Sequence, residues 1–387
     1  MEWRERMSRR TTCLFCHSEL TEPLFRLKNV PALAQNMPTN SEEIKKDVGI
    51  DLSLHQCPYC GLVQLDSPPV FYYRDVIRSG GYATTMKDLR LEQYRGFIKE
   101  GRLENKKIIE VGCGAGEFLS LLQDNFPVKA YGIEHNPDLV KAARDAGLNV
   151  QCGFIETNKE KLNHAPFEAF MMFNFLEHLP DPSMFLQGIC SNLSDESWGL
   201  ITVPAWEYIY DHNGFYELIA DHIAYYSKET FCRMLEMNGF EIVHCEIINR
   251  DTWSATVKKI RQTDLSQMEK HFFDLKNEIL NAILSWHNQN KTISVWGAGH
   301  QGLTAISSMN LEPYLQFVID SAPFKQGKYT PASHLKIISP TEFYSAPTDV
   351  VIVMAPGYTD EIVSLLQNRV KTIAVLRTDN LEIVSDQ

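Results

Sequence analysis

Four cysteines near the start of the chain have the spacing of metal ligands. They form two Cys-x-x-Cys pairs, Cys13 with Cys16 and Cys57 with Cys60. Each pair brings two thiolates within reach of one ion, and four thiolates complete a tetrahedral structural zinc site without an open position for chemistry. His17 and His55 lie beside the pairs and are less favoured substitute ligands. Two unrelated pairs of buried cysteines are the alternative.

A glycine-rich turn follows an apolar run in the segment IIEVGCGAGEF, residues 108–118. Gly112, Gly114 and Gly116 allow the backbone to bend sharply and to approach a ligand closely. Glu110 precedes the turn, and Glu134 ends the next apolar run, 18 residues after Gly116. A carboxylate at that strand end can bind both hydroxyls of a ribose. The pattern therefore predicts a nucleoside-containing cofactor.

A second turn, Gly297-x-Gly299-x-x-Gly302, has the spacing of a dinucleotide-binding fingerprint. We expect no acidic residue at the end of its following strand in the ribose-binding manner. Asp320 is the nearest candidate, 18 residues beyond Gly302, so spacing alone leaves a nucleotide open.

Around both turns, apolar runs alternate with helix-like segments, which predicts βαβ units on parallel sheets. The long amphipathic stretch 264–290 separates the two regions. We therefore expect an α/β fold with four parts. These are a zinc-binding module (1–70), a cofactor-binding domain (71–260), a helical connector (261–290) and a Rossmann-like domain (291–387).

The composition limits the classes of partner. The chain has 387 residues, 44% of them hydrophobic, with a formal net charge of -12. An acidic chain without Lys/Arg blocks is a poor candidate for binding nucleic acid or a membrane surface. We expect no secretory signal and no membrane span, and a cytoplasmic location in which cysteines stay reduced.

The turn at Gly112 resembles the first motif of class I S-adenosylmethionine (SAM) methyltransferases, and Glu134 resembles their ribose-binding acid. SAM has no pyrophosphate, so the turn need not cradle phosphates, and an acidic residue before it does not repel the sulfonium. The segment FMMFNFLEHLPDP resembles the family's stretch beside the cofactor, with Asn174, Glu177 and His178 after the strand, and Phe154 lies in the loop expected at the adenine. A dinucleotide site is the alternative.

The segment after the second turn, residues 320–340, resembles the C-terminal domain of sugar C-methyltransferases, which methylate nucleotide-linked keto-deoxysugars. That family has a zinc module, a methyltransferase domain and a Rossmann-like C-terminal domain, in the order expected here. The resemblance implies SAM and structural zinc as cofactors, a nucleotide-linked sugar as small-molecule partner, and a monomer or homodimer. It also implies that the second turn shapes the substrate site. Gln301 departs from the lysine that the family often has in this turn.

Methylation of a carbon next to a ketone needs a base that is neutral near pH 7, which suits histidine. The segment 217–231 resembles the family's catalytic stretch, with His222 as candidate base and Asp221 in place of the usual glutamate. Asp221 either orients His222 or contacts the substrate. His178, His135 and His212 are competitors, of which His178 is the strongest. The structural alternative is a histidine satisfied on an aromatic surface.

The stretch 71–88 resembles the family's segment over the active site, with Ser79 and Tyr82 as the nearest equivalents of its catalytic serine and tyrosine, although Ile77 replaces another tyrosine. Arg74, Arg78 and Lys87 either meet a diphosphate or form a solvated helix face.

Three other functions stay open. The residues before Asp221, Ile219 and Ala220, differ from the family's Tyr-His, so transfer to oxygen or nitrogen of another metabolite is the first alternative. An NAD-binding oxidoreductase that uses the second turn is another. A zinc-ribbon interaction protein is the weakest, since the chain lacks a basic surface.

Overall fold

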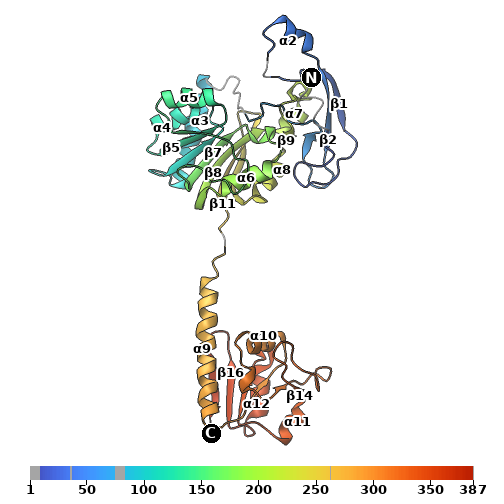
Figure 1. Cartoon of the computed structure of the whole chain (residues 1–387), viewed down its shortest axis with the longest axis vertical. Coiled ribbons are helices and arrows are strands. Elements are labelled where there is room, and N and C mark those ends of the chain that lie inside the picture. Colours follow the sequence, from blue (N-terminus) through green and yellow to red (C-terminus); the bar gives the residue numbers. More distant parts are fainter. Residues whose placement is uncertain (1–8, 35–36, 75–82, 262, 387) are drawn as a thin grey trace. The chain divides into compact units, whose positions relative to one another are not determined.

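The computed structural model describes residues 9–34, 37–74, 83–261 and 263–386 (Figure 1). The chain folds as two compact units, Met1–Arg261 and Gln262–Gln387, each with its own hydrophobic core. The first unit holds a small antiparallel sheet and a large mixed sheet, and the second holds one mixed sheet.

The small sheet belongs to the cysteine-rich module, but its last strand comes from far along the chain. Its strand order is β1-β2-β3-β9, with bounds Phe25–Val30, Ile50–Gln56, Val63–Leu65 and Ala224–Tyr225. The module also contains α2 (Ser41–Lys46), which begins after the N-cap Asn40. Because β9 starts two residues after His222, the module and the predicted catalytic segment share one sheet.

The large sheet has the strand order β10-β11-β8-β7-β4-β5-β6. Its strands are β4 (Lys107–Val111), β5 (Lys129–Glu134), β6 (Val150–Cys152), β7 (Phe167–Phe173), β8 (Leu193–Pro204), β10 (Phe240–Ile248) and β11 (Thr252–Lys259). The five strands from β8 to β6 are parallel, and β11 and β10 continue the sheet antiparallel. The parallel strands bring the carboxyl ends of β4, β5, β6 and β7 to one edge.

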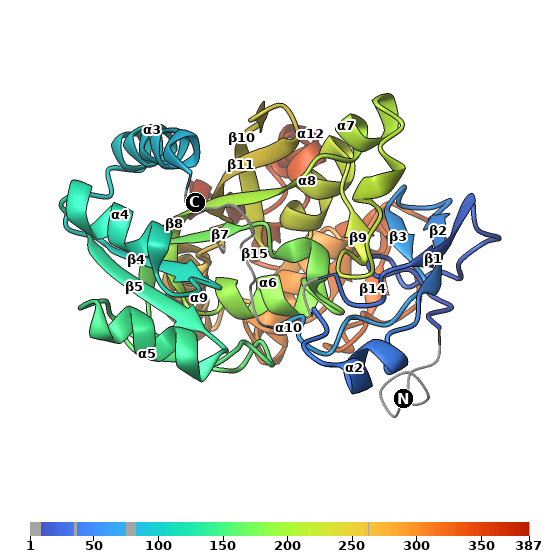
Figure 2. The same cartoon turned by 90° about the horizontal axis from the view of Figure 1, so that it is seen from above.

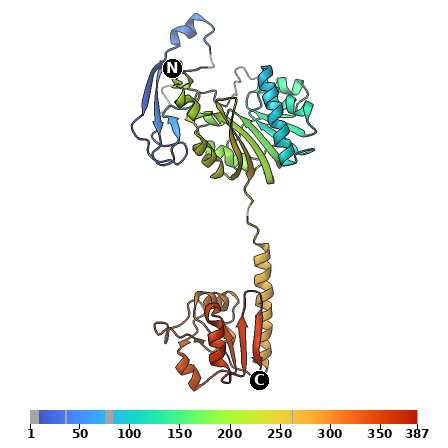
Figure 3. The ribbon, with the colours of Figure 1, turned by 180° about the vertical axis from the view of Figure 1, so that it is seen from behind.

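Helices cover both faces of this sheet (Figures 2 and 3). Side chains of α3, α4 and α5 form one core, and those of α6 and α8 form another with the opposite face. The bounds are α3 (Thr84–Gly101), α4 (Glu117–Asn125), α5 (Pro137–Asp145), α6 (Pro182–Cys190), α7 (Trp206–Asp211) and α8 (Lys228–Glu236), with short 3₁₀ turns η1 (Leu176–His178) and η2 (Phe215–Glu217). Burial from both sides explains why β7 is apolar at every position except Glu168.

Local sequence signals set the ends of these helices. Asn136 caps α5 by accepting from two backbone N–H groups, and Pro137 occupies its first turn. Ser227 and Thr230 form a reciprocal capping box at the start of α8. Asn136 comes soon after β5 and Ser227 soon after β9, so the two caps set where the connections that follow these strands end.

The second unit has a six-stranded sheet of order β14-β13-β12-β15-β16-β17, in which β17 alone is antiparallel to its neighbour. Its strands are β12 (Ile293–Trp296), β13 (Val318–Ile319), β14 (Ile337–Ile338), β15 (Val350–Val353), β16 (Thr372–Leu376) and β17 (Leu381–Asp386). Its helices are α9 (Ser266–Asn288), α10 (His300–Ser308), α11 (Pro340–Ser345) and α12 (Thr359–Leu366), with 3₁₀ turns η3 (Glu312–Tyr314) and η4 (Pro356–Tyr358). The α/β fold class is confirmed.

The helix expected as a connector packs on this second sheet. α9 buries Leu275, Ile279, Ile283 and Trp286, whose spacing of three and four residues places them on one face. These side chains belong to the same core as β12 and β15. α9 is therefore an integral element of the second unit.

The expectation about the acid of the second turn is wrong. Asp320 directly follows β13, and its Oδ2 accepts the backbone N–H of Ala298 in the turn at 2.9 Å. Lys325 also binds this carboxylate at 2.9 Å. The acid thus lies beside its glycine turn after all, because the chain returns Asp320 to the end of β12 through the parallel β12–β13 pair.

Within the described parts of the chain, every helix is too short or too polar to cross a bilayer.

Candidate functional site

The first glycine-rich turn joins β4 to α4 in a backbone conformation that requires glycine. Gly112, Gly114 and Gly116 have φ angles of 69°, 60° and 88°. A side chain at these angles would be strained, and a Cβ on Gly116 would also collide with Leu148. The turn therefore has the shape that the glycine spacing predicts, with its backbone at the carboxyl end of β4. Glu110, on β4 itself, is fully buried.

Glu134 ends β5 and binds this turn directly. Its Oε2 accepts the N–H of Gly114 at 2.9 Å, and its Oε1 accepts the N–H of Asn136 at 2.9 Å. The residue is 1% exposed. Each carboxylate oxygen thus binds a backbone N–H group at the carboxyl end of β5. Glu134 thus fixes the turn from the neighbouring strand.

A small cavity, of about 10 Å³, lies beside the turn, where β4, β5 and β6 end. Gly112, Ile133, His135 and Phe154 are among the residues that line it. The Phe154 ring packs against Phe185, with 5.1 Å between ring centroids. Phe154 is therefore part of an apolar wall next to the glycine turn.

Asn174 lies at the end of β7, at the same edge of the sheet. Its backbone has a φ of 47°, and its N–H donates to the Thr202 carbonyl at 2.9 Å. Its side-chain Oδ1 accepts from Thr202 Oγ1 at 2.6 Å. The side chain is exposed and is held by the neighbouring strand β8.

Two candidate bases, His178 and His222, lie side by side. Their ring centroids are 4.8 Å apart, and the rings meet edge to face. His178 Nδ1 is 2.8 Å from the Asp221 carbonyl oxygen. Because a carbonyl only accepts, this Nδ1 carries the proton, and Nε2 holds the lone pair when the ring is neutral.

Burial lowers the pKa of both imidazoles. The pKa of His222 lies well below the ordinary 6.5, because of burial first and of the neighbouring His178 second. Burial also lowers the pKa of His178, against the opposing effect of the Asp221 carbonyl. Both rings are therefore neutral near pH 7, the state that a general base requires.

Glu177 lies beside the two histidines and is 1% exposed. Within the described residues neither of its carboxylate oxygens has a hydrogen-bond partner, and Oε1 is 3.9 Å from His178 Nε2. Burial raises its pKa to about 8, so the carboxyl is mostly protonated at pH 7. Glu177, His178 and His222 also offer ligand atoms within 4.8 Å of one another, which meets the distance requirement of a metal site.

Asp221 has its carboxylate bound to the N-terminal module. Oδ1 accepts from Tyr72 Oη at 2.8 Å, and Oδ2 accepts from the N–H of Ala34 at 3.2 Å. Its carbonyl oxygen is the partner of His178. Tyr72 lies in the stretch 71–88 that resembles the family's segment over the active site, but its pairing with Asp221, 149 residues away, has no signal in the sequence. Asp221 therefore links the module to the loop that carries His222.

The other candidates are scattered or not described. Ser79, Tyr82 and Arg78 lie outside the described residues. His135 lies beside Phe154, with 6.2 Å between the rings. His212 ends α7 and binds the Tyr208 carbonyl there. Lys87 lies in the first turns of α3 and is half-buried. Arg74 contacts Glu156 and Phe154 and thus lies at the predicted cofactor loop.

The four N-terminal cysteines form one cluster. The Sγ atoms of Cys13, Cys16, Cys57 and Cys60 all lie within 4.8 Å of one another. Cys13 Sγ is 3.5 Å from Cys60 Sγ, and Cys16 Sγ is 3.4 Å from Cys57 Sγ. The edge of a tetrahedral zinc–thiolate site is about 3.8 Å, so the donors fit zinc. His55 binds the Thr21 carbonyl and is not part of the cluster.

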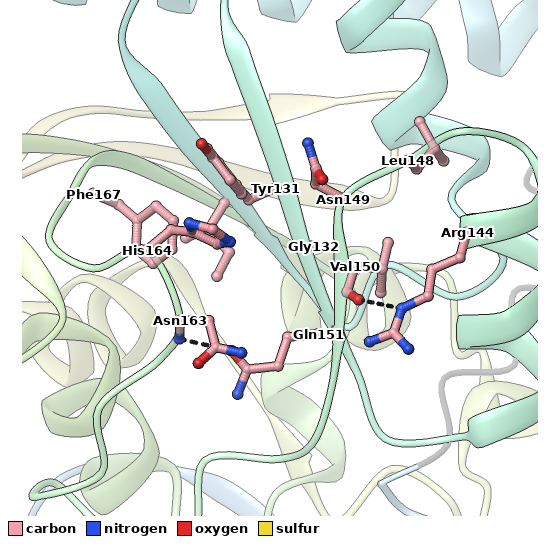
Figure 4. Close-up of a pocket in the computed structure, with 11 residues that line it drawn as sticks. Tyr131, Gly132, Arg144, Leu148, Asn149, Val150, Gln151, Asn163, His164 and Phe167 are labelled. Atoms are coloured by element: carbon pink, nitrogen blue, oxygen red, sulfur yellow. Dashed lines mark hydrogen bonds between the residues drawn. The ribbon is translucent and has the colours of Figure 1, made fainter.

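A second cavity, of about 290 Å³, lies on the β5–β6 side of the large sheet (Figure 4). Its lining includes Tyr131, whose ring packs 4.9 Å from that of His164, and Arg144, whose Nε donates to the Val150 carbonyl. None of the predicted cofactor or catalytic residues lines this cavity. It is therefore distinct from the site at the glycine turn.

Two family models match this chain. Residues 85–245 match a methyltransferase domain, and residues 255–374 match a C-methyltransferase C-terminal domain. A curated relative, the C-methyltransferase NovU of Streptomyces niveus, is 21% identical over 372 residues, which cover 86% of this chain and 86% of NovU.

Solved methyltransferase structures resemble part of the chain. The magnesium protoporphyrin IX methyltransferase of Synechocystis, with bound S-adenosylhomocysteine (SAH), is 13% identical, with a TM-score of 0.37 over 47% of this chain and 90% of its own. The plantazolicin methyltransferase BpumL, also with SAH, is 14% identical, with a TM-score of 0.38 over 46% of this chain and 86% of its own.

Proposed function

Since this chain belongs to the C-methyltransferase family and is a SAM-dependent methyltransferase, we propose that it methylates a carbon atom next to the ketone of a nucleotide-linked keto-deoxysugar. The single observation that carries the carbon chemistry is the neutral histidine pair, His178 and His222, at the edge of the sheet that carries the glycine turn. The sugar is supported by the resemblance of residues 320–340 to the C-terminal domain of sugar C-methyltransferases.

The residues at the glycine turn suit SAM, which supplies an electrophilic methyl group. The turn at Gly112, Gly114 and Gly116 allows close backbone approach, Glu134 accepts ribose hydroxyls, and Phe154 packs beside adenine. Asn174, at the end of β7, faces the same edge. The side-chain amide of Asn174 is exposed and is held in place by β8, so it can contact a polar group of the cofactor.

In the reaction, His222 takes the proton from the carbon next to the ketone onto a ring nitrogen. The electrons of that C–H bond form an enolate, whose carbon then bonds to the methyl group as the bond from sulfur to methyl breaks. The enolate oxygen needs a hydrogen-bond donor, the role we assign to Tyr82 or Ser79. His178 supports His222, and Asp221 holds the loop in place through Tyr72 and Ala34.

We also propose that the four-cysteine cluster binds a structural zinc ion. Four thiolates leave no open coordination position, so this ion takes no part in the transfer. Thiols that bind zinc must stay reduced, and the proposed location is accordingly the cytoplasm.

The experiment that tests the base is the substitution His222→Ala. We expect turnover of the keto-sugar to fall by at least about a hundredfold, the usual contribution of a general base. Affinity for SAH, measured by calorimetry, should stay within about twofold, since His222 lies outside the cofactor cavity. His212→Ala, on the exposed end of α7, is the matched control and should leave both unchanged.

A second readout separates carbon from oxygen or nitrogen transfer. If carbon is the acceptor, the parent enzyme exchanges the α-proton of the substrate for solvent deuterium without SAM, and His222→Ala abolishes the exchange. Methyl transfer without exchange in either protein would contradict the proposal.

The metal content of the protein gives a further check. A second metal ion per chain would point to binding by Glu177, His178 and His222, and a histidine bound to metal is not free to act as the base.

A further inference from the structure

A short segment after the small sheet contacts both halves of the candidate site. Tyr72 binds Asp221, next to the proposed base, at 2.8 Å. Two residues later, Arg74 reaches the loop after β6, which carries Phe154 and Glu156. The segment therefore connects the base loop with the loop that we assign to the adenine of the cofactor.

The guanidinium of Arg74 is held in a defined place. Its Nη2 is 3.0 Å from Glu156 Oε1, and its Nε donates to Tyr73 Oη at 3.1 Å. Its Cζ lies 5.1 Å from the centroid of the Phe154 ring. Arg74 and Glu156 are 34% and 53% exposed at their side chains, so the ion pair alone contributes little to stability. The ring contact and the two hydrogen-bonded partners together orient the group.

The position of Arg74 relative to the strand ends indicates which part of the cofactor it meets. Arg74 lines the cavity that Gly112, His135 and Phe154 also line. The strands β4, β5 and β6 are neighbours in that order. Since the turn follows β4 and the ribose acid Glu134 ends β5, the base of the nucleoside falls beyond the ribose, at the end of β6. Phe154 and Arg74 lie there.

We propose that Arg74 is a cofactor-binding residue that forms one wall of the adenine pocket with its guanidinium plane. A planar cation stacks on an aromatic face and is weakly hydrated, so arginine suits this position better than lysine. Glu156 neutralises the charge and fixes the orientation. The adenine and the sulfonium lie on opposite sides of the ribose, so Arg74 should contribute equally to the affinity for SAM and for SAH. The proposal rests on SAM as cofactor and not on the identity of the acceptor.

The test measures affinity for SAH and for SAM by calorimetry in the full-length protein. We expect Arg74→Ala to weaken both by about tenfold, a size between those of an exposed and a desolvated cation–π contact. Arg74→Lys keeps the charge but not the plane, and should recover only part of the loss. Glu156→Gln should weaken both ligands by about twofold to threefold, since it loosens the guanidinium. Arg95→Ala removes an exposed arginine that pairs with Glu92 on α3, and should change nothing.

Several results would overturn the proposal. One is an affinity of Arg74→Ala for SAH within twofold of the parent. A second is a loss confined to SAM, which would point to the sulfonium instead of the adenine. If Arg74→Ala also lowers the melting temperature of the ligand-free protein, the Arg74→Lys variant is the deciding one. An SAH affinity of Arg74→Lys equal to that of the parent would overturn the role of the guanidinium plane. No acceptor enters these measurements, so they stand or fall separately from the keto-sugar assignment.

Discussion

Glu177 is a costly residue to bury beside two histidines. Both carboxylate oxygens lack hydrogen-bond partners among the described residues, and burial holds the pKa at about 8. A buried carboxyl that cannot be paired stays neutral, and the proton it keeps is a cost of folding at neutral pH. A neutral acid here also leaves the adjacent imidazoles without a counter-ion, which agrees with their lowered pKa values.

The protonation of Glu177 makes stability depend on pH in a defined direction. Its pKa is 4.5 in the unfolded chain and about 8 in the folded protein. Folding therefore takes up a proton between these values, and the free energy of unfolding falls as the pH rises through that range. Glu177→Gln carries no such proton. Its stability relative to the parent should rise on the order of 3 kcal/mol between pH 4.5 and 7.

Urea unfolding of both proteins at pH 5, 7 and 8 checks this expectation. Glu229→Gln, an exposed residue on α8, is the control and should differ from the parent by the same small amount at each pH. A stability difference for Glu177→Gln that does not change with pH would show that the carboxyl is ionised in the folded protein.

At the scale of elements, the turn between β4 and α4 depends on the strand beside it. Glu134 closes the turn from the end of β5 by accepting from Gly114. The second unit repeats the device, with Asp320 after β13 accepting from Ala298. An acidic residue at the end of the strand that follows the glycine turn thus accepts a hydrogen bond from a backbone N–H of the turn. A carboxylate at this position can also bind the hydroxyls of a ribose.

We expect Glu134→Ala to weaken SAH binding by about tenfold to a hundredfold, the worth of one or two hydrogen bonds to a charged group. Glu134→Gln keeps one acceptor oxygen and should lie between the alanine variant and the parent. Calorimetry with SAH measures both, and Glu104→Ala, an exposed residue before β4, is the control. Unchanged affinity in the alanine variant would refute the ribose role.

The sequence predicts those elements whose signals are local. The glycines of the first turn, the acid at the end of β5 and the paired cysteines each lie within short motifs, and the structure brings each group together. The contacts of Tyr72 with Asp221 and of Arg74 with Glu156 cross 149 and 82 residues, and no periodicity marks them. The expectation about Asp320 is wrong because spacing does not show which backbone N–H group a carboxylate binds.

At the scale of the molecule, the small sheet of the first unit joins the cysteine-rich module to the segment that carries His222. Cys57 and Cys60 flank the turn between β2 and β3, and β3 pairs with β9, which follows His222. Asp221 binds the same module through Tyr72 and Ala34. A metal ion in the cysteine cluster would therefore stabilise the loop that carries the proposed base, although it lies outside the reaction.

Loss of zinc should thus lower both stability and turnover, with little effect on cofactor affinity. We expect Cys57→Ser to reduce zinc from one ion per chain to nearly none. It should also lower the melting temperature by roughly 10 °C, since several kcal/mol of metal binding contribute to folding. Turnover should fall as well, because β3 no longer holds β9 in register.

The affinity for SAH should stay near that of the parent, since the cavity at the glycine turn lies on the large sheet. Cys152→Ser, an exposed cysteine at the end of β6, is the control and should retain zinc. Full zinc content in Cys57→Ser by mass spectrometry would contradict the assignment of the site.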